Sequence, residues 1–130
     1  MTELRGRIIK RGRGAGRVLF SRVPLSFFGG VDLDRGVVSE PGHPLNGRSI
    51  AGHVLVFPHG KGSTVGSYAL LRLARRAIGP AAIVNRSCET IVAVGAIIAG
   101  IPCVDLIDID RLAHVDNAVV DDGVVSWQDV

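Results

Sequence analysis

The chain has 130 residues, with 15 Lys and Arg against 12 Asp and Glu, and 47% of its residues are hydrophobic although only 5% are aromatic. This length fits one domain over residues 1–130, because a domain of about 150 residues already hides roughly two thirds of its unfolded surface. The apolar content excludes a disordered chain. No run reaches the ~18 apolar residues of a membrane span, and the N-terminus lacks the apolar segment of a signal peptide, so we expect a cytoplasmic protein without membrane contact.

Much of the positive charge lies near the N-terminus, on Arg5, Arg7, Lys10, Arg11, Arg13 and Arg17. Residues 5–11 and 17–21 have the apolar content of short strands, and the GRGAG stretch between them predicts a hairpin turn. A basic hairpin suits a nucleic-acid-binding module. No aromatic residue lies among these charges to stack on bases, so we prefer a solvated hairpin and expect no nucleic acid partner.

The middle of the chain alternates between predicted strands and helices. The preceding segment, Pro24–Pro44, is rich in Gly, Pro and Asp and predicts a loop with at most a short strand at Gly36–Ser39. The later strands are predicted at His53–Phe57, Ala81–Asn85 and Cys103–Ile107. Their continuous apolar runs are typical of strands covered on both faces, and the alternation implies a parallel sheet with right-handed crossovers. The tail, Asn117–Gln128, predicts a hairpin that turns at Asp-Gly.

Two helices are predicted between these strands. The first is amphipathic, with an arginine stripe opposite an apolar one, and we expect it to end at Gly79 and Pro80. The second spans Glu89–Gly100 and is apolar all round, and its β-branched residues would also suit a strand. We expect a buried helix with Ser87 as N-cap and with Gly95 allowing close backbone approach. The fold class is therefore α/β, with a mostly parallel central sheet, helices and flanking β-hairpins.

The carboxyl ends of parallel strands are where ligands bind in such sheets. The first end gives His59 to Thr64, the second gives Asn85 to Ser87, and the third gives Asp105 and Asp108. We expect these groups to lie on one side of the sheet, in an order that the sequence leaves open.

Ser63 lies where the glycine-rich loop becomes the first helix. A serine at this position suits an N-cap, whose oxygen accepts a hydrogen bond from a first-turn N–H group. The surrounding glycines also suit a reacting hydroxyl, because they let a substrate approach the backbone. As a base, Ser63 would need its alkoxide to be stabilised by backbone N–H groups, the helix N-terminus and Lys61. Both roles remain open at this point.

The familiar nucleotide-binding and hydrolase motifs are absent from this loop. Gly62 separates Lys61 from Ser63, which breaks the P-loop spacing; the glycines give GxGxxxG rather than GxGxxG; and no GxSxG motif is present. The four histidines are scattered and receive no role. Cys88 and Cys103 lack metal-site spacing, so we expect buried free thiols and no metal on this chain.

Four motifs, taken in order, carry a family resemblance: GGVD at Gly29–Asp32, the run His43–Leu70, AAIVN at Ala81–Asn85, and GAIIAGIPCVD at Gly95–Asp105. With them, the chain resembles the small subunits of archaeal phosphomevalonate dehydratases, a branch of the aconitase X family. The most specific motif is GKGSTVGS, within the second run. The resemblance covers nearly the whole chain apart from its basic start, and it implies the swivelling β/β/α domain of that family.

The resemblance implies a hydro-lyase subunit that is active only with a large subunit carrying an iron-sulfur (4Fe-4S) cluster. The implied reaction dehydrates (R)-5-phosphomevalonate to trans-anhydromevalonate 5-phosphate, in the archaeal modified mevalonate pathway of isoprenoid biosynthesis. Ser63 would accept the proton while the partner's cluster acts as a Lewis acid on the substrate's hydroxyl and carboxylate. By position, we expect substrate contacts from Lys61, Gly62, Thr64, Ser67 and Arg86. The same architecture acting on another hydroxy acid, such as hydroxyproline, is the alternative.

Overall fold

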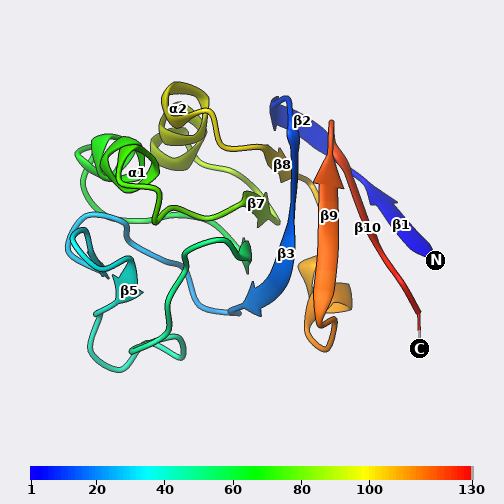
Figure 1. The fold of residues 1–130 in the computed structure, drawn as a ribbon, viewed down its shortest axis with the longest axis horizontal. Coiled ribbons are helices and arrows are strands. Elements are labelled where there is room, and N and C mark those ends of the chain that lie inside the picture. Colours follow the sequence, from blue (N-terminus) through cyan, green and yellow to red (C-terminus); the bar gives the residue numbers. More distant parts are fainter. Residues whose placement is uncertain (130) are drawn as a thin grey trace.

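The structure, a computed structural model, describes residues 1–129; Val130, the last residue of the expected domain, lies outside the described part. In this part the chain forms ten strands, two α-helices and one 3₁₀ helix (Figure 1). The strands are β1 (Thr2–Arg5), β2 (Arg7–Lys10), β3 (Arg13–Phe20), β4 (Val31–Asp32), β5 (Val37–Val38), β6 (Val54–Phe57), β7 (Ala82–Asn85), β8 (Cys103–Asp105), β9 (Asn117–Asp121) and β10 (Val124–Trp127). The helices are α1 (Gly66–Arg75), α2 (Thr90–Ala99) and η1 (Ile109–Leu112).

Eight strands form one curled sheet in the order β1-β10-β9-β3-β6-β7-β8-β2. The strands β3, β6, β7 and β8 run parallel, as the strand-helix alternation predicts, and antiparallel strands extend the sheet on both sides. Only Gly6 separates β1 from β2, although these strands lie at opposite ends of the sheet order. The two edges of the sheet therefore meet at Gly6, whose N–H donates to the carbonyl of Gly123 (2.9 Å).

The parallel strands carry apolar side chains on both faces. In β6, Leu55 and Phe57 point into a core shared with α1 and α2, whereas Val54 and Val56 point into a second core shared with β9, β10 and η1. Figure 1 shows the helices on one side of β6–β8 and the antiparallel strands β9 and β10 on the other. This β/β/α layering confirms the predicted fold class, and it explains why the central strands read as continuous apolar runs.

The predicted N-terminal hairpin is wrong. β2 and β3 do not pair with each other: β2 pairs with β8, and β3 pairs with β9 and β6. Most of the GRGAG stretch is strand rather than turn, because Gly14 and Gly16 lie against the backbone of neighbouring segments. A methyl group on Gly14 would overlap the carbonyl oxygen of Ala81, and one on Gly16 would overlap that of Gly52. These glycines serve close packing, which the sequence cannot distinguish from turn formation.

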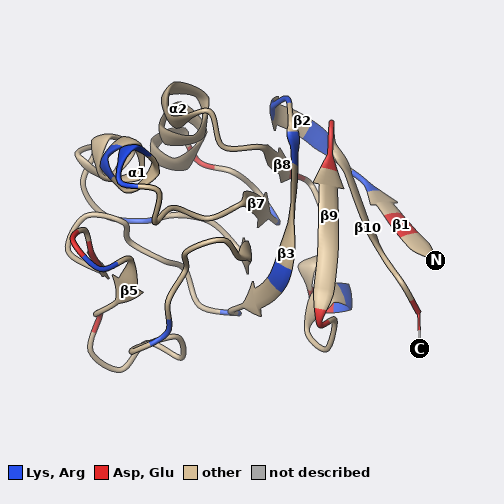
Figure 2. Ribbon diagram, viewed as in Figure 1, with Lys and Arg blue, Asp and Glu red and all other residues tan. Residues whose placement is uncertain are grey.

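The basic N-terminal strands are fixed by carboxylates. Asp105 is fully buried, and Arg7 binds it with two hydrogen bonds, from Nε to Oδ1 (2.9 Å) and from Nη2 to Oδ2 (2.7 Å). The hydrogen bond and the charge of Asp105 raise the pKa of Arg7 above its ordinary value. Arg11 lies 3.8 Å from Asp122. Figure 2 shows the blue basic segments of β2 and β3 near the start of the chain. Some of the basic side chains near the N-terminus therefore form ion pairs within the chain, and these pairs hold neighbouring strands of the sheet together.

Replacing Arg7 with alanine should lower the thermal unfolding midpoint by roughly 5–10 °C, because the buried carboxylate of Asp105 loses its charged partner and keeps only the N–H group of Cys88 as a donor. Differential scanning calorimetry measures the shift. Arg5→Ala, on the adjacent strand β1, is the matched control and should shift the midpoint little. Adding Asp105→Asn to the Arg7→Ala variant should recover part of the loss. A double variant that is less stable than Arg7→Ala would contradict this explanation.

The helix termini differ from the predicted ones. α1 ends at Arg75, before the expected Gly79, because Ala77 adopts a left-handed conformation (φ 59°) and Ile78 N–H closes the helix onto the carbonyl of Leu73 (3.0 Å). The N-cap of α2 is Glu89, not Ser87: its carboxylate accepts from Ile91 N–H and Val92 N–H, both at 2.8 Å. The left-handed Gly100 at the end of α2 is confirmed. None of the described helices has the length and apolarity to cross a membrane.

Candidate active site

The carboxyl ends of the parallel strands meet at one edge, as expected. The N–H groups of Arg86 and Ser87 donate to the carbonyl of Pro58 (3.0 and 3.2 Å), and Leu106 N–H donates to the carbonyl of Arg86 (3.1 Å). The ends of β6, β7 and β8 are thus adjacent in that order. The segment after β3 joins them, because Leu25 N–H donates to the carbonyl of His59 (3.4 Å). The structure therefore supplies the order that the sequence left open.

Ser63 is exposed and is not the N-cap of α1. The helix begins after Val65, whose side chain makes no capping hydrogen bond. The hydroxyl oxygen of Ser63 accepts from Val65 N–H (3.2 Å), and its carbonyl accepts from Gly66 N–H (2.9 Å). Both donors belong to the start of α1, where free N–H groups create a partial positive charge, and the first turn holds no acidic residue to offset it. The oxygen of Ser63 thus lies at the positive end of a helix.

The glycines of this loop seat it against the protein. A methyl group on Gly60 would overlap the carboxylate of Glu89, and one on Gly62 (φ +93°) would lie 2.7 Å from Ser26 Oγ. Gly66 packs in the same way against Ile91 of α2. From the sequence, these glycines were expected to let a substrate approach the backbone. In the structure, the side of each glycine that would carry a side chain faces another part of the chain. They fix the position of the loop that presents Ser63.

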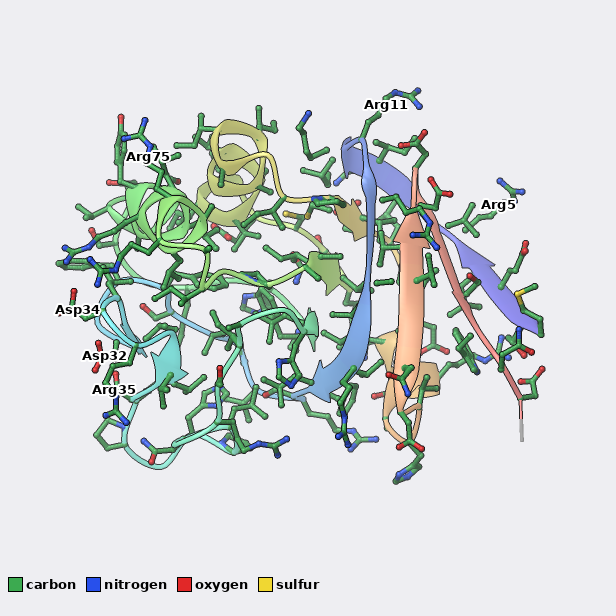
Figure 3. The ribbon with its side chains drawn as sticks, viewed as in Figure 1. Arg5, Arg11, Asp32, Asp34, Arg35 and Arg75 are labelled. Carbon is green, nitrogen blue, oxygen red and sulfur yellow. The ribbon has the colours of Figure 1, made fainter. Side chains whose placement is uncertain are left out.

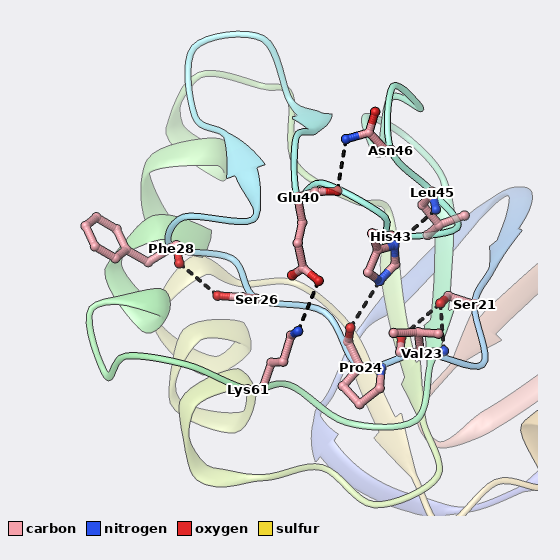
Figure 4. A network of polar contacts seen from close by, with 10 residues as sticks. All are labelled: Ser21, Val23, Pro24, Ser26, Phe28, Glu40, His43, Leu45, Asn46 and Lys61. Atoms are coloured by element: carbon pink, nitrogen blue, oxygen red, sulfur yellow. Dashed lines mark hydrogen bonds and ion pairs between the residues drawn. The ribbon is translucent and has the colours of Figure 1, made fainter.

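The two predicted cations lie in different ion pairs. Lys61 Nζ contacts Glu40 Oε2 at 3.0 Å, which ties the serine loop to the segment after β5 (Figure 4). Arg86 Nη2 contacts Asp110 Oδ2 at 3.4 Å, and the other oxygen of Asp110 lies 3.3 Å from Arg22 Nε. Both ion pairs of Asp110 are partly exposed and long, so the guanidinium groups remain accessible to a stronger anion.

The other two predicted side chains differ in accessibility. Thr64 is exposed beside Ser63. Ser67 is only 6% exposed, and its hydroxyl donates to the carbonyl of Ile91 (2.7 Å). Its hydroxyl therefore already joins α1 to α2, and these contacts favour a packing role for Ser67 over substrate binding.

Sequence analysis missed several residues around the site. Arg22 and Asp110 join Arg86 from elements without a recognisable motif. Leu106, at the end of β8, is 60% exposed in a left-handed conformation (φ 58°), which is costly for a residue with a branched side chain. His43, which received no role from the sequence, is 5% exposed. Its Nδ1 accepts from Leu45 N–H (3.0 Å), so its Nε2 donates to the carbonyl of Pro24 (3.0 Å). It holds together the long loop drawn in Figure 4.

The cysteines suit packing rather than a metal centre. Cys103 is buried, Cys88 is partly buried, and both are free thiols. The neighbouring thiol of Cys88 and burial raise the pKa of the Cys103 thiol far above its ordinary value, which makes this sulfur a poor metal ligand. Among residues 1–129, no three or more His, Cys, Asp or Glu side chains gather to hold a metal ion. The donor set of this chain does not fit an iron-sulfur cluster.

The strand-end site exposes Ser63, Thr64 and half of the Arg86 side chain on this chain. A cavity of about 730 Å³ lies elsewhere, beside β9 and β10, and its lining includes His114, Asp116 and Trp127. A neighbouring cavity of about 380 Å³ shares part of that lining. Neither includes the residues predicted to bind substrate. Enclosed sites are the ones that bury a small ligand, so this open edge would need a second surface to do so.

Comparison with known proteins identifies the class of this domain. Residues 3–126 match the family model of the aconitase X swivel domain. The chain therefore belongs to the aconitase X swivel domain family. In solved structures, it superposes on Thermococcus kodakaraensis aconitase X in the holo form with a TM-score of 0.96 and 46% identity, covering 99% of this chain and 100% of that one.

The names of the most similar relatives that we report are more specific than the name of the family. The phosphomevalonate dehydratase small subunit of Methanosarcina mazei is 56% identical over 108 residues, which cover 83% of this chain and 75% of that protein. The protein of the same name from Thermococcus onnurineus is 47% identical over 129 residues, covering 98% of this chain and 99% of that protein. The resemblance seen in the sequence is thereby confirmed.

Proposed function

We propose that this chain is the small subunit of a cytoplasmic dehydratase acting on (R)-5-phosphomevalonate, with Ser63 as the proton acceptor. Two lines support it: the names of the relatives, and the position of Ser63 Oγ, exposed and accepting a hydrogen bond from the N-terminus of α1. The second observation carries the proposal. A neutral serine hydroxyl is a very weak base, so Ser63 would act as its alkoxide after losing its own proton to solvent. The Val65 N–H group together with the helix dipole would stabilise the negative charge of this alkoxide until it takes the substrate's proton.

In this proposal, the substrate loses a proton from the carbon next to the one that bears its hydroxyl, and the hydroxyl leaves with its electron pair. The Ser63 alkoxide receives the proton and becomes a neutral hydroxyl, and the exposed Thr64 lies beside it to position a substrate oxygen. Arg86 is the substrate-binding cation at the end of β7, where its single long contact with Asp110 leaves donors for a phosphate or carboxylate. Lys61 lies in the same loop as Ser63, but its ammonium group would have to break its ion pair with Glu40 to bind an anion.

The iron-sulfur cluster implied by the family belongs, in this proposal, to a large subunit. The name small subunit implies such a partner, and the thiols of this chain do not fit a cluster. The open strand-end edge agrees with a substrate held between two chains. Bound to that partner, the cluster would supply the Lewis acid that takes up the leaving hydroxide.

Reconstitution tests the proposal. The chain is co-expressed anaerobically with the large subunit encoded in the same genome, and consumption of (R)-5-phosphomevalonate is followed by phosphorus NMR. We expect turnover by the pair and none by either subunit alone. Hydroxyproline is assayed in parallel as the alternative hydroxy acid. A pair that dehydrates hydroxyproline and leaves phosphomevalonate unchanged would overturn the substrate assignment.

A further inference from the structure

The helix α2 has an unusual outer face. Its ten residues, TIVAVGAIIA, contain no charged side chain, yet Val94 is 43% exposed, Ile97 is 52% exposed and Ile98 is 42% exposed. The helix was expected to be buried, and only one side of it is. Residues three and four apart share a helix face, so these three side chains form one apolar stripe. A helix that is apolar all round is normally covered on every side.

The stripe continues toward the candidate site. Ser67 of α1 bonds to Ile91 of α2, and Leu70 lies against Gly95, so the two helices run in the same direction with their N-termini side by side. Val65 and Tyr68, at the start of α1, are 45% and 68% exposed. Phe28 is 49% exposed, and its backbone lies 3.8 Å from the position of a methyl group on Gly66. The apolar surface thus extends from the Ser63 loop along α2.

The C-terminal half of α1 is charged where its first turn is apolar. On α1, Arg72 and Arg76 lie 2.8 and 4.0 Å from Asp34. Figure 2 shows basic residues coloured along the coil of α1 and none along that of α2. Figure 3 places Arg75 and Asp34 at the outer side of α1. Charged residues are depleted at the centres of protein interfaces, so the α2 face and the first turn of α1 match an interface, whereas the charged C-terminal half of α1 matches solvent.

We propose that the apolar face formed by Phe28, Val65, Tyr68, Val94, Ile97 and Ile98 is the docking surface for the large subunit. This inference rests on the proposed function, because a substrate shared between two chains requires the partner to cover the edge that carries Ser63. The apolar face adjoins that edge. A stable interface buries about 800 Å² on each partner, about an eighth of this chain's 6326 Å² surface. An interface of this size would have to include the apolar stripe of α2 in addition to the loop that carries Ser63.

The test is a triple variant, Val94→Ser, Ile97→Ser and Ile98→Ser, which leaves Ser63 and its loop unchanged. The three side chains are exposed, so the isolated variant should fold, and circular dichroism checks this. Binding of the tagged large subunit, measured by biolayer interferometry, should weaken at least a hundredfold. The control replaces Arg75 and Arg76, at the C-terminal end of α1, with serine and should change binding less than threefold. A triple variant that binds like the wild type would overturn the docking surface.

Further outcomes distinguish the large subunit from a second copy of this chain as the occupant of the surface, and the docking surface from the proposed function. Sedimentation of the isolated wild-type chain should show a monomer; a dimer that the triple variant abolishes would assign the face to a second copy and overturn the proposal. A wild-type pair that binds through this face without dehydrating phosphomevalonate would sink the proposed function and leave the surface standing. A triple variant that binds the large subunit and turns over normally would overturn the docking surface and leave the proposed function standing.

Discussion

Replacing Ser63 with alanine is expected to lower kcat of the reconstituted pair by about 10²- to 10⁴-fold, which is the usual contribution of a positioned acid or base. KM and the affinity for the large subunit should change little. The side chain is exposed, and its one hydrogen bond, to Val65 N–H, contributes at most about 1 kcal/mol to folding. Steady-state kinetics with (R)-5-phosphomevalonate measures the effect.

The chain offers a matched control for this variant. Ser49 is also exposed, and its hydroxyl accepts from the N–H two residues on, that of Ala51, at the same 3.2 Å. Ser49→Ala therefore removes the same kind of hydrogen bond outside the strand-end edge and should leave kcat unchanged. If Ser63→Ala retains turnover within threefold of the wild type, another group accepts the proton.

Replacing Gly14 with alanine is expected to lower the free energy of unfolding by at least about 3 kcal/mol, at the upper end of the cost of overpacking. The new methyl group would overlap the carbonyl oxygen of Ala81, just before β7, and would lie 3.2 Å from the side chain of Ala82. Both neighbours belong to the central sheet and have little room to shift. Urea unfolding followed by circular dichroism measures the loss.

Gly47→Ala separates this clash from ordinary glycine effects. Gly47 has a left-handed conformation (φ +84°) with no atom within 4 Å of the added methyl group, so alanine there should cost only about 1–2 kcal/mol. The comparison also decides between the two interpretations of GRGAG. In a solvated hairpin, Gly14→Ala would be milder than Gly47→Ala, and that result would contradict the strand assignment.

The α/β centre was predictable because its signals are local. The apolar runs of β6, β7 and β8, the stop at Gly100 and the turn at Asp122 and Gly123 all follow from periodicity or from residue types with a fixed backbone preference. The carboxyl ends of parallel strands must share an edge, so the position of the serine loop also followed. Local patterns predict well when the residues that carry them interact with near neighbours.

The site was predictable in its loop and less so in its details. Ser63 is exposed at the start of α1, as a reacting hydroxyl would be. Ser67, four residues later, instead donates its hydroxyl hydrogen bond to the carbonyl of Ile91 in the next helix. Glu89, rather than Ser87, caps α2, because its carboxylate reaches back over the first turn. Side chains of similar chemistry take different roles according to the backbone groups that the fold places opposite them.

The sequence by itself thus determined the parallel βαβαβ unit, the C-terminal hairpin and the loop that presents Ser63. Only the tertiary structure decided that β1 and β2 lie at opposite edges of one curled sheet, that Arg7 neutralises a buried Asp105, and that α2 leaves an apolar face uncovered. The physical reason is the range of the interactions. Periodicity and capping act within a few residues, whereas the partner of a glycine, an arginine or a helix face is set by segments that are distant in the chain.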